Sequence, residues 1–246
     1  MTGRRPPTAT YLIFGAILLG FVIEIATGAW RDFVKLAYLG AIVPSLIIDH
    51  GQFWRLLTAM FLHGDGTIQG TLIHLGVNLW ALWQLGRLYE MMFGTRRFVL
   101  IYFVSGIAAS ITSLLRYVLL HQEGSSVGAS GAIFGILGAF IFSIRRSPRW
   151  RNERWAKSIV QQLLFWIVLN ILIGLRIPQI DMAAHMGGLV AGLLLGALLP
   201  QREPPLPPSQ KQLAPLTSLI HELDLPLGDD AERGWKRHPL FLGTTP

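Results

Sequence analysis

The chain has 246 residues, of which 52% are hydrophobic and only 14% are charged, and its formal net charge is +7. Soluble domains carry about 25% charged residues, so the composition argues against a soluble domain. The absence of cysteine excludes disulfides, thiolate metal sites and a cysteine nucleophile. The arginines adjoin apolar segments instead of alternating with aromatic residues on a polar face, so the positive charge indicates membrane topology and not nucleic-acid binding.

Apolar runs long enough to cross a lipid bilayer recur along the chain. They predict an all-α membrane protein with six transmembrane helices, at 11–29, 72–92, 98–119, 130–144, 158–175 and 182–199. Residues 1–10 precede the first run, which no small-residue cleavage site follows, so we expect this run to remain as a signal-anchor helix. Residues 11–199 then form one membrane domain.

Lysine and arginine set the expected orientation, because they are enriched in cytoplasmic loops. With the amino terminus inside, ten of them face the cytoplasm: Arg4, Arg5, Arg96, Arg97, Arg145, Arg146, Arg149, Arg151, Arg154 and Lys157. Five face outward: Arg31, Lys35, Arg55, Arg116 and Arg176. Both termini are therefore expected in the cytoplasm, and a bacterial plasma membrane is the expected location.

The segment after the last span differs in composition from the rest of the chain. Nine of the 14 prolines fall within residues 200–246. A proline-rich polar segment cannot bury enough apolar surface to fold. We expect residues 200–246 to form a disordered cytoplasmic tail.

Two connections are expected to enter the membrane. The loop over residues 29–71 is too long for a simple linker, and its aromatic residues, among them Trp30 and Trp54, suggest that it is partly embedded in the outer leaflet. The fourth span is short, because 15 residues cover roughly 22 Å of a core about 30 Å thick. The Gly/Ser-rich segment 121–129 is expected to complete the crossing and to line a water-filled cavity above Ser130.

Four polar residues lie at a similar depth in the predicted spans. Counting back from the cytoplasmic end of each span places Ser130 and His185 about 22 Å deep, His74 about 24 Å and Asn78 about 18 Å. Glycines flank Ser130 and follow His185, and small residues let two helix backbones approach closely. The sequence therefore predicts that these four side chains meet.

A serine hydroxyl needs an adjacent base to become a nucleophile, and His185 is the candidate base for Ser130. The alternative is that each is a packing residue within a glycine-rich span. Asp181 lies a full turn outside His185, so a Ser–His dyad is expected instead of a triad. His74 and Asn78, at i and i+4, share a helix face and can donate hydrogen bonds to an oxyanion together with the Ser130 backbone N–H. Their alternative role is to bond neighbouring helices.

Two further polar residues have no clear partner in the sequence. Glu24 is isolated within the first apolar run, and a structural pairing or a cavity-facing position is expected for it. His63 lies in the first loop and is a candidate loop anchor.

The chain resembles the rhomboid intramembrane serine proteases over residues 11–199. The motifs that carry the resemblance are Trp54-Arg55, His74-x-x-x-Asn78, Leu85-Gly86 with Glu90, Gly128-Ala129-Ser130-Gly131 and His185-x-x-Gly188-x-x-x-Gly192. The resemblance implies a compact six-span bundle in which Ser130 is the nucleophile, His185 the base, and His74 and Asn78 hold the oxyanion.

The same resemblance implies that Phe134 stacks on His185, at a position where many members carry tyrosine. It also implies transmembrane proteins as substrates, cut near the outer end of a span, with no metal and no cofactor. One departure is the segment between His63 and His74, which is longer than the family pattern leads us to expect.

Three other functions compete with proteolysis by Ser130 and His185. A catalytically inactive protein of the same fold would bind transmembrane clients without cleaving them. A transporter or channel would show internal repeats or paired broken helices, which are not apparent. Metalloprotease or aspartyl chemistry would need H-E-x-x-H or two embedded aspartates, and the sequence has neither. The oligomeric state is left open.

Overall fold

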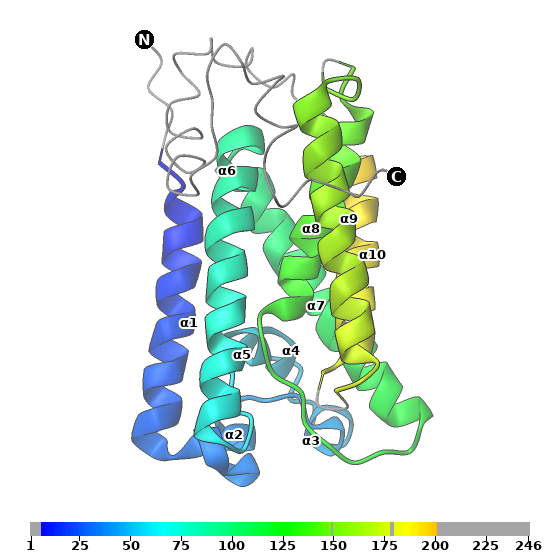
Figure 1. Ribbon diagram of the computed structural model, residues 1–246. Coiled ribbons are helices and arrows are strands. Elements are labelled where there is room, and N and C mark those ends of the chain that lie inside the picture. The colour runs from blue at the N-terminus through cyan, green and yellow to red at the C-terminus, as the bar shows by residue number, and fades with distance from the viewer. Residues whose placement is uncertain (1–5, 149, 178–179, 201–246) are drawn as a thin grey trace, which may run out of the picture. The chain divides into compact units, whose positions relative to one another are not determined.

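Helices dominate the chain in the computed structural model, which describes residues 6–148, 150–177 and 180–200 (Figure 1). In chain order the α-helices are α1 (Thr8–Thr27), α2 (Phe33–Leu39), α3 (Pro44–Ile48), α4 (Arg55–Thr58), α5 (Ile68–Ala81), α6 (Arg87–Phe93), α7 (Thr95–Leu119), α8 (Ser130–Arg146), α9 (Arg154–Gly174) and α10 (Met182–Leu198). The short 3-10 helices are η1 (Ala29–Arg31) and η2 (Ala59–Phe61), and η3 (Leu82–Gly86) is a π-helical segment between α5 and α6.

Helical segments cover the six apolar ranges, so the prediction of an all-helical protein is confirmed for the described part of the chain. The second range corresponds to α5, η3 and α6 in succession. Within the described ranges, α1, α7 and α9 are long and apolar enough to cross a membrane, and α10 is a shorter apolar helix. The predicted tail from residue 201 onward, and Arg4 and Arg5 near the amino terminus, lie outside the described residues.

Local capping explains where several helices begin and end. Thr67 accepts a hydrogen bond from the Gly70 N–H, so α5 begins at Ile68 and not at residue 72 as expected. Asp32 caps α2 in the same way. Gly28 ends α1 with a φ of 75°, a left-handed conformation that glycine adopts without strain.

The amino-terminal end of α1 is fixed by a carboxylate from another helix. Glu90 on α6 accepts hydrogen bonds from the Ala9 N–H at 3.1 Å, the Thr10 N–H at 2.8 Å and the Thr10 hydroxyl at 2.7 Å. The Thr95 hydroxyl, at the start of α7, donates to Glu90 at 2.8 Å. Glu90 therefore satisfies free N–H groups of α1 and joins α1, α6 and α7 at one end of the bundle.

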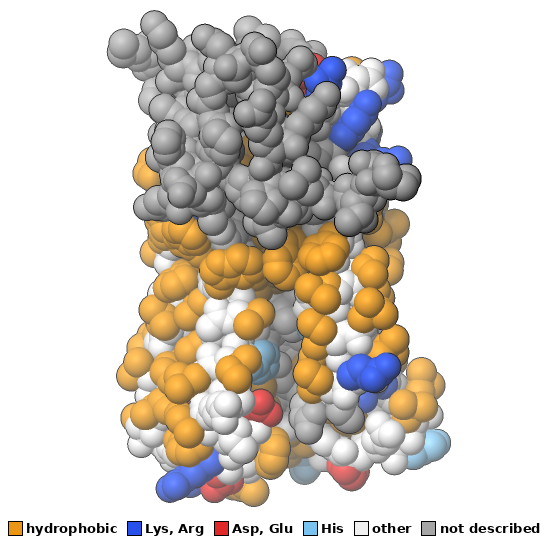
Figure 2. All heavy atoms as spheres, viewed as in Figure 1, with side chains coloured by type: hydrophobic (Ala, Val, Ile, Leu, Met, Phe, Trp, Pro, Cys, Tyr) orange, Lys and Arg blue, Asp and Glu red, His pale blue; other side chains and the backbone are white. Residues whose placement is uncertain are grey.

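The helix α8 is the centre of the fold. Nearly all of its residues from Gly131 to Ile144 are buried, with Phe142 an exception, as expected for a helix that is apolar on every side. On α1 and α9, by contrast, large apolar side chains such as Leu12, Leu19, Phe165 and Leu172 are exposed. Figure 2 shows hydrophobic side chains across the middle of the viewed face, a surface suited to lipid.

The contact between α8 and α10 is made by glycines. A Cβ atom built on Gly188 would lie 2.7 Å from the carbonyl carbon of Gly131, and one built on Gly192 would lie 2.6 Å from that of Gly135. Both distances are shorter than real side chains allow, so the two backbones touch directly. The predicted close approach of these helices is confirmed.

The loop between α1 and α5 is structured. Its helix α4 begins at Arg55, whose side chain is only 3% exposed. The guanidinium donates to the carbonyl oxygens of Ala37 and Ala41 and to the Gln52 side chain, and it stacks on the Trp54 ring at 4.6 Å. Arg55 therefore holds the first loop together, and embedding of this loop in the outer leaflet stays a prediction.

Candidate active site

Ser130 and His185 meet at the contact between α8 and α10. Ser130 is the first residue of α8, and His185 lies in the first turn of α10. The Ser130 hydroxyl oxygen lies 2.8 Å from His185 Nε2, within hydrogen-bond distance. Two residues 55 positions apart in the sequence are thus in the arrangement that a nucleophile and its base require.

The His185 ring is oriented by packing. Phe134, one turn after Ser130 on α8, stacks on it with ring centroids 4.4 Å apart and an angle of 15° between the planes. His185 Nδ1 has no hydrogen-bond partner among the described residues. Asp181, the nearest acid in the sequence, bonds to Ser113, Ser126 and the Ala184 N–H instead. No carboxylate in the described part of the chain therefore bonds to His185 as the third member of a triad would.

His74 faces the same space as Ser130. A Cβ atom on Gly128 would lie 2.8 Å from His74 Nε2 and 3.8 Å from the Ser130 hydroxyl oxygen, so both atoms border the position that the glycine leaves empty. The φ of Gly128 is +126°, which other residues rarely adopt. This position therefore requires glycine both for its conformation and for the space between the two side chains.

Asn78 is buried one turn after His74 on α5. Its Nδ2 donates to the His74 carbonyl oxygen at 2.8 Å, which fixes the side chain against its own helix. The amide has a second N–H and an oxygen with which to make other contacts. A role for Asn78 toward an oxyanion stays a prediction.

His63 supports this region from the first loop. Its side chain is 0% exposed, and its ring meets that of His74 edge to face at a centroid distance of 5.0 Å. His63 Nε2 accepts a hydrogen bond from the Ala129 N–H at 3.5 Å, directly before Ser130. The expected role of His63 as a loop anchor agrees with these contacts.

Glu24 on α1 holds the His63 segment. Its side chain is 0% exposed, and its Oε1 accepts the backbone N–H groups of His63 at 2.6 Å and Gly64 at 3.2 Å. The expected structural pairing of Glu24 is thus confirmed. The partners could not be identified from the sequence, because they are backbone groups about forty residues away.

The long spacing between His63 and His74 has a local explanation. A bend at Gly66 and Thr67 precedes α5, and the Asp65 N–H donates to the Thr71 hydroxyl. The helix α5 begins early, at Ile68. The added residues therefore lie in the helix and in the segment before it, while the His63 and His74 rings remain in contact.

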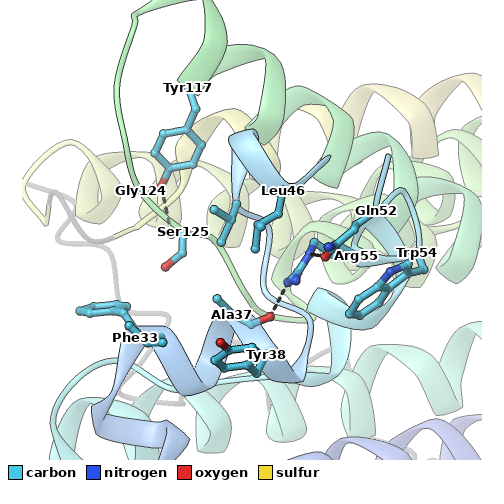
Figure 3. Close-up of a pocket in the computed structure, with 12 residues that line it drawn as sticks. Phe33, Ala37, Tyr38, Leu46, Gln52, Trp54, Arg55, Tyr117, Gly124 and Ser125 are labelled. Carbon is cyan, nitrogen blue, oxygen red and sulfur yellow. Dashed lines mark hydrogen bonds between the residues drawn. The ribbon is translucent and has the colours of Figure 1, made fainter. Parts of the chain in front are cut away.

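A separate cavity of about 930 Å³ lies between the first loop and the segment that follows α7. Figure 3 shows Phe33, Tyr38 and Trp54 around it, with Arg55 bonded to the Ala37 carbonyl oxygen. Neither Ser130 nor His185 lines this cavity. The water-filled cavity that the sequence predicts above Ser130 therefore stays a prediction.

Comparison with known proteins places these residues in a family. The Rhomboid domain model matches residues 50–202. The chain is 37% identical to the rhomboid protease GluP of Bacillus subtilis (strain 168) over 194 residues, which are 78% of this chain and 35% of GluP. It is 37% identical to the RHOMBOID-like protein 6, mitochondrial, of Arabidopsis thaliana over 67% of this chain and 49% of that protein.

The chain thus spans between a third and a half of these two relatives. The rhomboid homologue YdcA of Bacillus subtilis is matched almost completely, with 32% identity over 203 residues that cover 81% of this chain and 92% of YdcA. The apolar helices and these homologues make the chain a multi-pass membrane protein. The chain belongs to the rhomboid family and is homologous to rhomboid serine proteases.

Proposed function

We propose that the chain is an intramembrane serine endopeptidase that cleaves transmembrane segments of other membrane proteins with a Ser130–His185 dyad. The observation that carries the proposal is the 2.8 Å distance between the Ser130 hydroxyl and His185 Nε2. Packing alone gives no reason for a histidine to enter an apolar helix and meet a serine at hydrogen-bond distance.

The chemistry follows from that contact. The Ser130 oxygen attacks the carbonyl carbon of the scissile bond while His185 Nε2 takes the hydroxyl proton. When the C–N bond breaks, His185 returns the proton to the leaving nitrogen. His185 Nε2 then takes a proton from water, whose oxygen attacks the ester carbon. The bond from that carbon to the Ser130 oxygen breaks, His185 returns the proton to Ser130, and a carboxylic acid is released. Stacking on Phe134 keeps the imidazole in the orientation that both transfers need.

The carbonyl oxygen gains negative charge during the attack and needs hydrogen-bond donors. Ser130 begins α8, and the first N–H groups of a helix have no partner within it. The Ala129 N–H is directed to His63, which leaves the N–H of Ser130 as the nearest backbone candidate. His74 supplies a side-chain donor next to Gly128, and Asn78 is the further candidate from the same helix face.

The proposed topology has six spans with both termini in the cytoplasm. The start of α1 and the connection between α8 and α9 lie at the same end in Figure 1, and Arg145, Arg146 and Arg151 are exposed there. Basic residues favour the cytoplasmic side. Ser130 then begins its helix on the outer side, and substrates would be cut toward the outer end of their spans.

The test is the substitution Ser130→Ala in the purified protein, reconstituted into liposomes with a single-span reporter. We expect wild type to cleave the reporter and to react with a fluorophosphonate probe, and the variant to do neither. The matched control is Ser105→Ala on α7, which removes a buried hydroxyl without a hydrogen-bond partner in the described residues and should retain both reactions.

The competing function is that of an inactive rhomboid-fold protein that binds transmembrane clients. It predicts that wild type captures the reporter without cleaving it and does not react with the probe. Reporter cleavage that persists in Ser130→Ala would contradict the assignment of the nucleophile.

A further inference from the structure

One carboxylate outside the proposed dyad connects the segments that carry its two members. The Asp181 side chain accepts hydrogen bonds from the hydroxyl of Ser113 on α7 and from the hydroxyl of Ser126, the latter at 2.8 Å. Its other oxygen accepts the Ala184 N–H at 3.1 Å and lies 3.8 Å from Arg116 Nε. A single side chain thus meets α7, the segment before α8 and the first turn of α10.

The bond to Ser126 acts on the segment that leads to the nucleophile. Ser126 lies four residues before Ser130, and its backbone pairs with Ile42 of the first loop through two hydrogen bonds of 3.0 and 3.1 Å. Its hydroxyl is directed to Asp181. Ser126 is therefore held from two sides, by the first loop through its backbone and by Asp181 through its side chain.

The bond to the Ala184 N–H acts on the helix of the base. Asp181 is the N-cap of α10, and its carbonyl oxygen accepts the His185 N–H at 3.1 Å. An N-cap fixes the first helical turn, in which His185 lies. The position of His185 therefore depends on the same residue that holds Ser126.

We infer that Asp181 is a positioning residue, which sets the distance between Ser130 and His185 by joining the Ser126 segment to the start of α10. It does not touch the reacting atoms, and its role rests on the proposed dyad. A carboxylate has two oxygens that can each accept more than one hydrogen bond, so the single side chain of Asp181 can hold both segments at once.

The experiment compares variants by their rate of reaction with a fluorophosphonate probe, expressed per folded molecule, and by kcat and KM for a single-span reporter. Ser126→Ala removes only the side-chain link to the nucleophile segment. Asp181→Ala removes all the side-chain links and leaves the backbone bond from the His185 N–H to the carbonyl oxygen of residue 181. In both variants we expect the rate of reaction with the probe and kcat to fall about tenfold or more, while KM stays nearly unchanged. Asp181→Asn can cap α10 and donate to both serines, so it should retain most of the rate.

The matched control is again Ser105→Ala, a serine-to-alanine change on the same helix as Ser113. The inference is overturned if Ser126→Ala and Asp181→Ala lower the melting temperature but react as fast per folded molecule as this control. Equal losses in Asp181→Asn and Asp181→Ala would also overturn it, because charge and not the link would then matter. A wild-type protein that neither cleaves nor reacts would refute the proposed function itself, which is a distinguishable result.

Discussion

The glycine contact between α8 and α10 allows a quantitative prediction for Gly188→Ala. The new methyl would overlap the carbonyl group of Gly131, whose oxygen is its nearest atom. Even the carbonyl carbon would lie only 2.7 Å away, whereas ordinary contact begins at 3.4 Å, so this carbon alone requires the helices to separate by at least 0.7 Å. Gly131 follows Ser130 and Gly188 lies one turn after His185, so this separation falls at the dyad. The distance between Ser130 and His185 would grow from 2.8 Å to roughly 3.5 Å or more, where a hydrogen bond is lost.

We expect Gly188→Ala to lower the rate of reporter cleavage about 100-fold, because a misplacement of about 1 Å can cost that much. We also expect it to lower the free energy of unfolding by roughly 1–3 kcal/mol, because the added methyl overpacks the helix contact. The measurements are reporter cleavage in liposomes and thermal unfolding in detergent. The control is Gly196→Ala on the same helix, where the nearest atom, the Ala139 carbonyl oxygen, is 3.0 Å from the added methyl. Gly196 lies eight residues further along α10, so Gly196→Ala should lower the rate of reporter cleavage less than tenfold.

The refuting result is equally direct. If Gly188→Ala cleaves the reporter as fast as Gly196→Ala, the close approach of the two backbones does not determine the geometry of the dyad.

Substitutions at three further residues test contacts that support the dyad and the helix bundle. Phe134→Leu removes the stacking on His185, which contributes about 0.5–1.5 kcal/mol. It should lower kcat about two- to tenfold and change the melting temperature little. An unchanged kcat would contradict the orienting role of Phe134. Glu90→Ala leaves α1 N–H groups without partners and should lower stability by about 3 kcal/mol, measured by urea unfolding, while the probe rate per folded molecule stays near wild type. Glu24→Leu frees the His63 segment and should slow the reaction with the probe. Glu24→Gln keeps an acceptor oxygen and should react nearly as fast as wild type. A slow Glu24→Gln variant would show that hydrogen-bond acceptance by residue 24 is not what supports the site.

The helices and their contacts were largely predictable because the physical signals are local. Apolar runs locate the helices, and glycine spacing on the runs that carry Ser130 and His185 indicates which two can touch. The rise of an α-helix converts positions in the sequence into depths, which is why the similar depths of Ser130 and His185 follow from counting alone. In the structure Gly131 and Gly188 face each other next to the two side chains, which are 2.8 Å apart.

The supports of the site were less predictable because their partners are set by tertiary structure. Glu24 accepts backbone N–H groups, and every residue except proline offers one, so no side-chain pattern identifies its partners. The Arg55 guanidinium likewise bonds to backbone carbonyl oxygens of the first loop, whose path depends on the packed fold. For Asp181, distance from His185 in the sequence excluded a triad role, but it could not indicate Ser113 and Ser126 as partners.

The burial of α8 has a consequence for how the protein responds to its bilayer. Hydrophobic mismatch acts on helices that touch acyl chains, by tilting them or by thinning the lipid around them. Here α1 and α9 expose large apolar side chains, whereas α8 is covered along nearly its whole length. Changes in acyl-chain length would therefore be absorbed by the peripheral helices, and the helix that begins at Ser130 would keep its place as bilayer thickness varies.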